Sequence, residues 1–387
     1  MEALASVAAV LMLAGIYFYT HRLFGWGMRQ NLLLASGLGA SYILGALSAN
    51  PVSAALGRRA TFRLVQIILL TLISTAVVFH SPPPLVLILI LYSGVSGGQW
   101  PVLESMVSQA SSGKVLSKRL AFYNLDWSAA NVVALALSGT IIQHWPTGIF
   151  IVAGLCTLCS TLLIHFRGIE PDAAAAGPVK PESELLAMRT QALWLSRIAL
   201  PSTYVVVSSL NAMMPSLPIM RSISTQWGTL LGSVWFAARC IAFAILGATA
   251  FWHTRPKLML LAAFLMLIAF LGVTLRPQDL FPQAHLTANA DLLSMILSQI
   301  VLGAAMGIIY SASLYFGMVL SEGSTEHGGY HEALIGAGMV LGPASAFIAE
   351  AIRPGETVFG ITAVAGLIGL SVLAAVSAVV FGRRAQR

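Results

Sequence analysis

The sequence predicts an all-α integral membrane protein, with twelve transmembrane helices in two pseudo-symmetric six-helix bundles. Hydrophobic residues make up 57% of the 387 positions and charged residues only 9%, which is too little charge for the surface of a soluble protein. The apolar runs continue for about 20 residues without alternating, which favours helices over the strands of a membrane barrel. The sequence ILGA also occurs twice, at 43–46 and 245–248, which indicates a duplication.

Twelve apolar stretches are long enough to cross a bilayer as helices. Six are predicted in an N-terminal bundle over 1–167, at 3–20, 30–51, 61–80, 84–109, 120–143 and 147–167. Six are predicted in a C-terminal bundle over 192–387, at 193–214, 228–252, 257–275, 291–318, 331–352 and 357–381. The two copies of ILGA fall in the second span of each bundle, as expected for a duplicated membrane protein.

A polar segment at 168–191 separates the two bundles. Proline and four consecutive alanines predict a flexible linker at its start. Ser183, followed by Glu-Leu-Leu-Ala-Met-Arg, predicts a capped amphipathic helix lying at the membrane interface. We therefore expect a linker between two membrane bundles.

Basic residues are concentrated in one set of loops, for example at 58–59, 118–119 and 255–257. Positive loops face the cytoplasm, so we expect a multi-pass protein of the inner (cytoplasmic) membrane with both termini cytoplasmic. The net charge of +7 is spread over short loops with no basic block, so no nucleic-acid partner is expected. The expected partners are the lipid bilayer, a small-molecule substrate and protons, and we expect a monomer.

The loop between spans two and three ends in Gly57-Arg58-Arg59. With twelve spans and a central linker, the chain resembles the major facilitator superfamily of transporters. That family's loop usually carries an Asp where this chain has Ala54. The resemblance makes Arg58 and Arg59 candidates for gating. Three further patterns look like poorly characterised prokaryotic members of the family: Trp100-Pro101…Glu104, Asn124-x-x-Trp127-Ser128 and His331-Glu332…Gly342-Pro343.

Arg239 lies near the middle of the eighth predicted span, one turn after Trp235. A guanidinium group at that depth costs at least about 2.5 kcal/mol, so it should face a cavity or a partner. One interpretation is a binding residue for an anionic or carbonyl-bearing substrate, held by bidentate contacts. The other is a structural ion pair or a clamp on backbone carbonyls.

Uncharged polar side chains also occur on helices that line the cavity in this family, as the resemblance implies. Each of them is a candidate for substrate binding. The alternative is a hydrogen bond to a neighbouring helix, which stabilises the fold by about 0.6 kcal/mol on average. Together with Arg239 and Trp235, the candidates are Asn131, Trp100, Gln99, Tyr204, Asn211 and Tyr310.

Three acids are candidates for proton coupling or gating. Asp126 and Glu104 lie on the cytoplasmic halves of spans five and four, where each could relay protons or pair with Lys118 or Arg119 as a latch. Glu332 opens the predicted span eleven, where an acid complements a helix N-terminus. A proton relay and a latch both stay open for Asp126 and Glu104, and proton coupling and helix capping both stay open for Glu332.

The sequence predicts no cofactor, no metal site and no enzyme. His331-Glu332 resembles the start of a zinc-protease motif, but position 335 is Ile instead of the second His. Glycines at 336, 338 and 342 indicate close helix packing, since no strand precedes them. No nucleophile–base pair stands out either.

The leading hypothesis is a secondary active transporter of a small organic solute, anionic or amphiphilic, working by alternating access with proton coupling. The alternative is a non-transporting sensor or scaffold that has kept the fold. A cavity containing Arg239 would favour transport, whereas a packed core around that residue would favour the scaffold.

Overall fold

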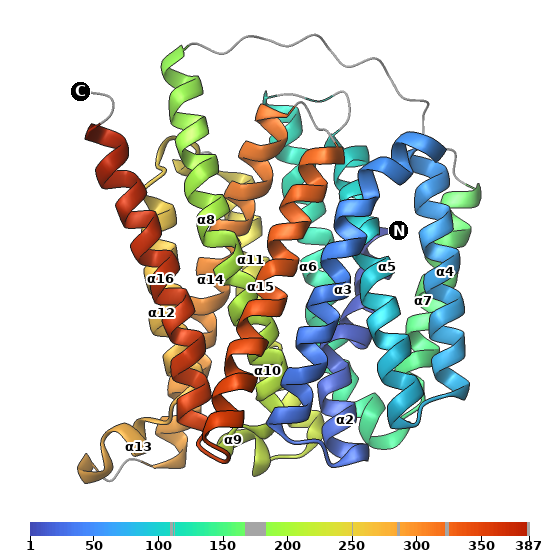
Figure 1. Cartoon of the computed structure of the whole chain (residues 1–387), viewed down its shortest axis with the longest axis vertical. Coiled ribbons are helices and arrows are strands. Elements are labelled where there is room, and N and C mark those ends of the chain that lie inside the picture. The colour runs from blue at the N-terminus through green and yellow to red at the C-terminus, as the bar shows by residue number, and fades with distance from the viewer. Residues whose placement is uncertain are drawn as a thin grey trace.

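The computed structural model describes residues 1–108, 111, 113–166, 183–249, 251–284, 287–321 and 325–384, and its long helices run side by side in a single bundle (Figure 1). In these residues, eleven helices are long and apolar enough to cross a membrane, and α12 is a shorter apolar twelfth. The helical membrane fold is therefore confirmed.

The first six spans form what we call the N half. The first of them, Glu2–Phe24, is interrupted by a π-helical segment at Leu11–Gly15. The helices of this half are α1 (Glu2–Val10), α2 (Ile16–Phe24), α3 (Met28–Leu56), α4 (Arg58–Val78), α5 (Pro82–Ser108), α6 (Gly113–His144) and α7 (Gly148–Phe166).

The last six spans form the C half, in which the second span is broken at Ser233 between two helices. Two short helices, α9 (Pro218–Arg221) and α13 (Pro277–Leu280), lie in connections. The long elements are α8 (Ser183–Met213), α10 (Thr225–Gly232), α11 (Val234–Ala248), α12 (Leu258–Thr274), α14 (Ala288–Leu320), α15 (Thr325–Ile352) and α16 (Thr357–Arg384). The predicted bundle boundaries at 167 and 192 stay a prediction.

Two ends of the bundle are named here by residues in their loops. The Arg58 side is where α3 ends and α4 begins, and the Gly25 side is where α2 ends and α3 begins (Figure 1). Gly25 and Gly57 both have positive φ angles, 64° and 80°, a conformation that favours glycine at these sharp reversals.

The predicted interfacial helix is wrong as a separate element. Helix α8 begins at Ser183 and continues without a break to Met213, so its polar first turns extend a membrane-crossing helix. The rest of the predicted linker, 168–182, lies outside the described residues.

Span eleven begins six residues before the predicted start, because α15 starts at Thr325. Its first turns are buried against protein instead of lipid: His327 is 6% exposed and its Nδ1 lies 2.9 Å from an Arg197 guanidinium nitrogen. Polar residues can therefore continue the helix beyond the apolar stretch. Glu332 thus lies two turns inside α15, and its interpretation as a helix cap is wrong.

Glycines let α15 approach α8 closely within the C half. A Cβ atom at Gly338 would lie 2.1 Å from the Pro201 carbonyl oxygen, and one at Gly342 would lie 2.4 Å from that of Val205. Packing of small residues replaces the hydrophobic effect as the main attraction between helices in lipid. These two glycines therefore fix the distance between α8 and α15.

We predict that Gly338→Ala destabilises the protein, because overpacking a tight contact costs about 1–3 kcal/mol. The melting temperature of the purified protein should fall by a few degrees. Gly366→Ala on α16 is the matched control, because a Cβ there meets nothing within 4 Å. Equal melting temperatures for the two variants would contradict this account of α8–α15 packing.

Candidate functional site: a cavity between the two halves

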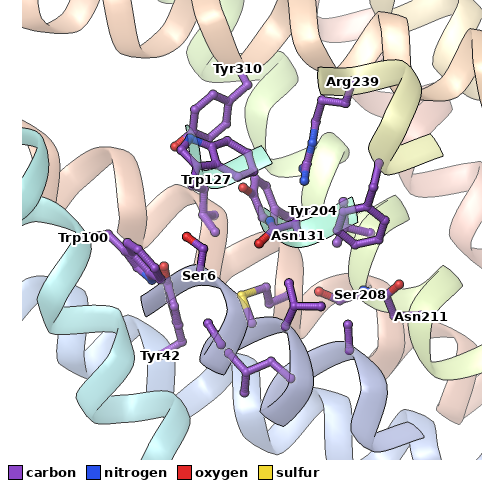
Figure 2. Close-up of a pocket in the computed structure, with 18 of the residues that line it drawn as sticks. Ser6, Tyr42, Trp100, Trp127, Asn131, Tyr204, Ser208, Asn211, Arg239 and Tyr310 are labelled. Carbon is purple, nitrogen blue, oxygen red and sulfur yellow. The ribbon is translucent and has the colours of Figure 1, made fainter. Parts of the chain in front are cut away.

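A cavity of about 160 Å³ lies between the N half and the C half. Side chains of α1, α3, α5 and α6 line it from one half, and side chains of α8, α11, α14 and α15 line it from the other (Figure 2). Nine of its 24 lining residues are aromatic, and polar groups lie on both sides. This is the composition of a site for a small organic molecule.

Seven of the eight predicted substrate-binding residues line this cavity. The exception is Gln99, which is 1% exposed and accepts a hydrogen bond of 2.9 Å from Gln66 Nε2 on α4. Gln99 therefore joins α4 to α5 and does not face the cavity. The seven that line it are Arg239, Trp235, Asn131, Trp100, Tyr204, Asn211 and Tyr310.

Arg239 is held by aromatic rings and not by an acid. Its Cζ lies 4.5 Å from the ring centroid of Trp127, 5.0 Å from that of Trp235 and 5.1 Å from that of Phe236. No carboxylate of the described residues forms an ion pair with it. A guanidinium over an aromatic ring gains roughly 0.5–2 kcal/mol per favourable contact. Among the described residues, neither the ion pair nor the clamp on backbone carbonyls that the structural interpretation predicted is observed.

Trp127 joins the two halves at this point. It lies on α6, and its ring makes edge contacts with Phe243 on α11 and Tyr310 on α14, at centroid distances of 5.3 Å. Its Nε1 donates a hydrogen bond of 3.2 Å to Asn124 Oδ1. Sequence reasoning placed Trp127 only in a family pattern, because a tryptophan in an apolar helix carries no signal for the side that it faces.

Several polar atoms around the cavity have no hydrogen-bond partner within the described residues. They are Arg239 Nε, Asn131 Oδ1, Trp235 Nε1 and Glu2 Oε2. Unsatisfied polar groups away from water cost about 1–3 kcal/mol each. A solute that pairs with them would recover that cost.

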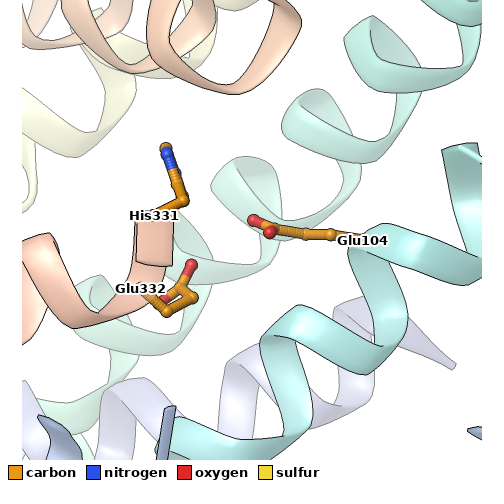
Figure 3. Close-up of side chains that lie close together, drawn as sticks. All are labelled: Glu104, His331 and Glu332. Atoms are coloured by element: carbon orange, nitrogen blue, oxygen red, sulfur yellow. The ribbon is translucent and has the colours of Figure 1, made fainter. Parts of the chain in front are cut away.

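An acidic cluster adjoins the cavity on the Arg58 side. Glu104 on α5 and His331 and Glu332 on α15 point toward a common space (Figure 3), with one potential ligand atom from each within 4.8 Å of the others. All three are buried, and the Tyr42 hydroxyl donates a hydrogen bond to Glu332 Oε2. The predicted latch from Glu104 to Lys118 or Arg119 is not observed, because Glu104 faces α15 and neither of its carboxylate oxygens has a hydrogen-bond partner among the described residues.

The remaining gating candidates lie outside the cavity lining. Asp126 Oδ2 accepts a hydrogen bond of 3.1 Å from the Ala3 backbone N–H. Arg59 donates to the Ile164 carbonyl oxygen at 3.4 Å, which joins α4 to α7 within the N half. Arg58 is half-buried at the start of α4. Gating by these residues stays a prediction.

The two halves touch at both ends of the cavity. On the Gly25 side, the Gly139 backbone N–H donates to Thr229 Oγ1 at 3.0 Å. On the Arg58 side, a Cβ at Gly247 would lie 2.5 Å from Ala121 Cβ, and one at Gly328 would lie 3.1 Å from Pro101 Cα. Opening the cavity toward either side requires the contacts at that end to separate.

The family model of the Major Facilitator Superfamily matches residues 3–329. The chain belongs to the major facilitator superfamily. Membership makes it a multi-pass membrane protein of a transporter family, as the resemblance implied. No curated protein sequence matches the chain.

Solved structures of major facilitator transporters have the same fold. A point mutant of the nucleoside transporter NupG superposes with a TM-score of 0.70 at 12% identity, covering 97% of each chain. The human organic anion transporter MFSD10 (TETRAN) gives 0.66 at 14% identity, covering 97% of this chain and 96% of that one. The proton:xylose symporter XylE, bound to 6-bromo-6-deoxy-D-glucose, gives 0.66 at 12% identity, covering 96% and 94%.

We predict that Gly139→Val and Gly247→Val bias this major facilitator protein toward opposite openings. Valine at 139 would collide with Thr229 on the Gly25 side, and valine at 247 would collide with Ala121 on the Arg58 side. The substitution Ser208→Cys, made in a protein that lacks the three native cysteines, reports whether an impermeant thiol reagent can reach the cavity. Gly139→Val should raise labelling several-fold from the Gly25 side, and Gly247→Val should raise it several-fold from the Arg58 side.

Gly369→Val is the control for this pair, because a Cβ there meets nothing within 4 Å. Its labelling should equal that of the parent. The account of the two contacts fails if both variants raise labelling from the same side.

Proposed function

We propose that this protein is a secondary transporter that moves a small organic solute with an anionic group by alternating access. Arg239 binds the anionic group, and the aromatic wall formed by Trp100, Trp127 and Trp235 accepts the apolar part. The observation that carries the proposal is a buried guanidinium in a cavity between the two halves, with no described acid paired to it. An intramembrane charge of that kind is a functional group by default.

The shape of the guanidinium supports an anionic ligand. It is planar and can donate two parallel hydrogen bonds to a carboxylate or phosphate. Its Cζ lies over rings of Trp127 and Trp235, so the N–H groups that point away from these rings remain for a ligand. Asn131 and Asn211 add neutral hydrogen-bonding groups on the cavity wall.

Transport is favoured over a sensor or scaffold role by the cavity itself. A scaffold would fill the space around Arg239 with packed side chains, whereas that residue lines an open volume. The likeness to an organic anion transporter is at 14% identity and shows the fold alone. The choice of an anionic solute therefore depends on Arg239.

We predict that Arg239→Ala lowers the affinity for an anionic solute by roughly 10- to 100-fold, because a hydrogen bond to a charged group contributes about 1.5–3 kcal/mol. Anions that bind are first found by a thermal-shift screen of organic anions, amphiphiles and sugars. Arg239→Lys keeps the charge but loses the planar contacts, so its affinity should fall between those of wild type and Arg239→Ala.

Arg353→Ala is the matched arginine control. Arg353 is exposed and pairs with Glu356 at 3.3 Å, so its loss should leave binding unchanged. An anion that binds Arg239→Ala as tightly as wild type would remove Arg239 from the solute site.

Coupling to protons through Asp126, Glu104 or Glu332 stays a prediction. At least one of the variants Asp126→Asn, Glu104→Gln and Glu332→Gln should abolish solute flux driven by a pH gradient in proteoliposomes, because an amide cannot carry the proton. Flux down a solute gradient alone is the control. Three variants with unchanged pH-driven flux would exclude this form of coupling.

A further inference from the structure

We propose that Glu104, His331 and Glu332 bind a divalent first-row transition metal ion of the zinc class. The site would bridge α5 of the N half and α15 of the C half at the Arg58 side of the cavity. It goes beyond the proposed transport of an anion and does not depend on it, because Arg239 lies on another helix and takes no part.

The geometry of the cluster suits three ligands of one ion. Their ligand atoms lie within 4.8 Å of one another, whereas neighbouring ligands of a tetrahedral zinc ion, with bonds of about 2.0 Å, are roughly 3.3 Å apart. A rotation of the Glu104 side chain covers the difference of at most about 1.5 Å. Carboxylates and imidazoles are both ligands of such ions.

Three of the possible ligand atoms have no hydrogen-bond partner among the described residues. Both carboxylate oxygens of Glu104 and the Nε2 atom of His331 have no hydrogen bond within the described residues. Glu104 is 0% exposed, His331 2% and Glu332 3%. Buried polar groups of native proteins nearly always have hydrogen-bond partners. Three unpaired atoms that could each bind a metal ion, all facing one space, therefore indicate a missing partner.

The charge of the cluster also favours a cation. No described lysine or arginine forms an ion pair with Glu104 or Glu332. Two carboxylates so close together in a buried position repel each other strongly. A divalent cation neutralises both in one step, while the imidazole adds a neutral ligand.

Two further side chains orient the ligands. His331 Nδ1 lies 3.0 Å from Ser313 Oγ on α14, and the tautomer with its proton on Nδ1 leaves the Nε2 lone pair free for a metal. The Tyr42 hydroxyl holds one oxygen of Glu332, which leaves the other oxygen available. Hydrogen bonds of this kind around metal ligands commonly change the affinity by 10- to 100-fold.

The imidazole selects the kind of ion. Mg²⁺ and Ca²⁺ prefer sites made of oxygen atoms, whereas imidazole suits zinc, iron and their neighbours. The sequence did not show this site because Glu104 is on a different helix, far from His331 in the chain. In the fold, Gly328 on α15 packs against Pro101 on α5, one turn before the ligands on each helix.

Cobalt binding to the purified full chain tests the site. Protein in nanodiscs is stripped of metal with a chelator and titrated with Co²⁺, whose visible absorption reports a site of low symmetry. We expect one equivalent bound per chain, displaced by Zn²⁺ but not by excess Mg²⁺. Glu104→Gln and His331→Gln should each weaken Co²⁺ binding by at least 10-fold, and Ser313→Ala by about 10-fold.

Two controls separate this site from other binding. His80→Gln changes an exposed histidine and should bind Co²⁺ as wild type does. Arg239→Ala should also keep Co²⁺ binding, so a failure of the anion proposal leaves this one standing. Size-exclusion profiles check that each variant is folded.

The proposal is overturned if folded wild-type protein shows no stoichiometric Co²⁺ absorption, which would mean that protons alone neutralise the acids. It is also overturned if Glu104→Gln and His331→Gln, both folded, keep the wild-type affinity. Displacement of Co²⁺ by Mg²⁺ would reject the proposed class of ion. If a ligand variant does not fold, the wild-type titration and Ser313→Ala decide.

Discussion

The cavity depends on close contacts between helices at glycine positions, where no side chain separates the two backbones. Gly39 on α3 lies against the Met339 backbone of α15, Gly139 on α6 against α10, and Gly247 on α11 against Ala121 of α6. In a bilayer, where apolar surface gains little by leaving lipid, such backbone contacts supply much of the attraction. They bring the halves together around the cavity, and a similar contact of Gly328 with Pro101 places Glu104 beside α15.

Opposite charges are kept apart within this interface. Arg239 lies against rings of α6 and α11, while Glu104 and Glu332 lie on α5 and α15 with no lysine or arginine partner among the described residues. Had they met, each would have satisfied the other as an inert buried pair. Their separation leaves one group suited to an anion and another suited to a cation, within reach of the same interface between the halves.

The fold could be predicted from sequence because lipid imposes a simple rule: a long apolar run must be a helix. Helix ends were less predictable, since buried polar residues such as His327 extend α15 beyond its apolar stretch. Most of the polar residues predicted to bind substrate from the middle of a span do line the cavity. Gln99 does not, because the sequence of one helix cannot show that Gln66 of another helix will donate a hydrogen bond to it. Trp127 and the Glu104–His331 proximity were missed since both depend on how distant helices pack.

The rings around Arg239 come from both halves of the protein. A bare guanidinium inside a membrane protein would resist any movement that exposes it to an apolar surface. Here Trp127 of one half and Trp235 and Phe236 of the other stabilise its charge through their rings. Separating α6 from α11 would take the Trp127 ring away from the guanidinium, so the contact that stabilises the charge also resists separation of the two halves.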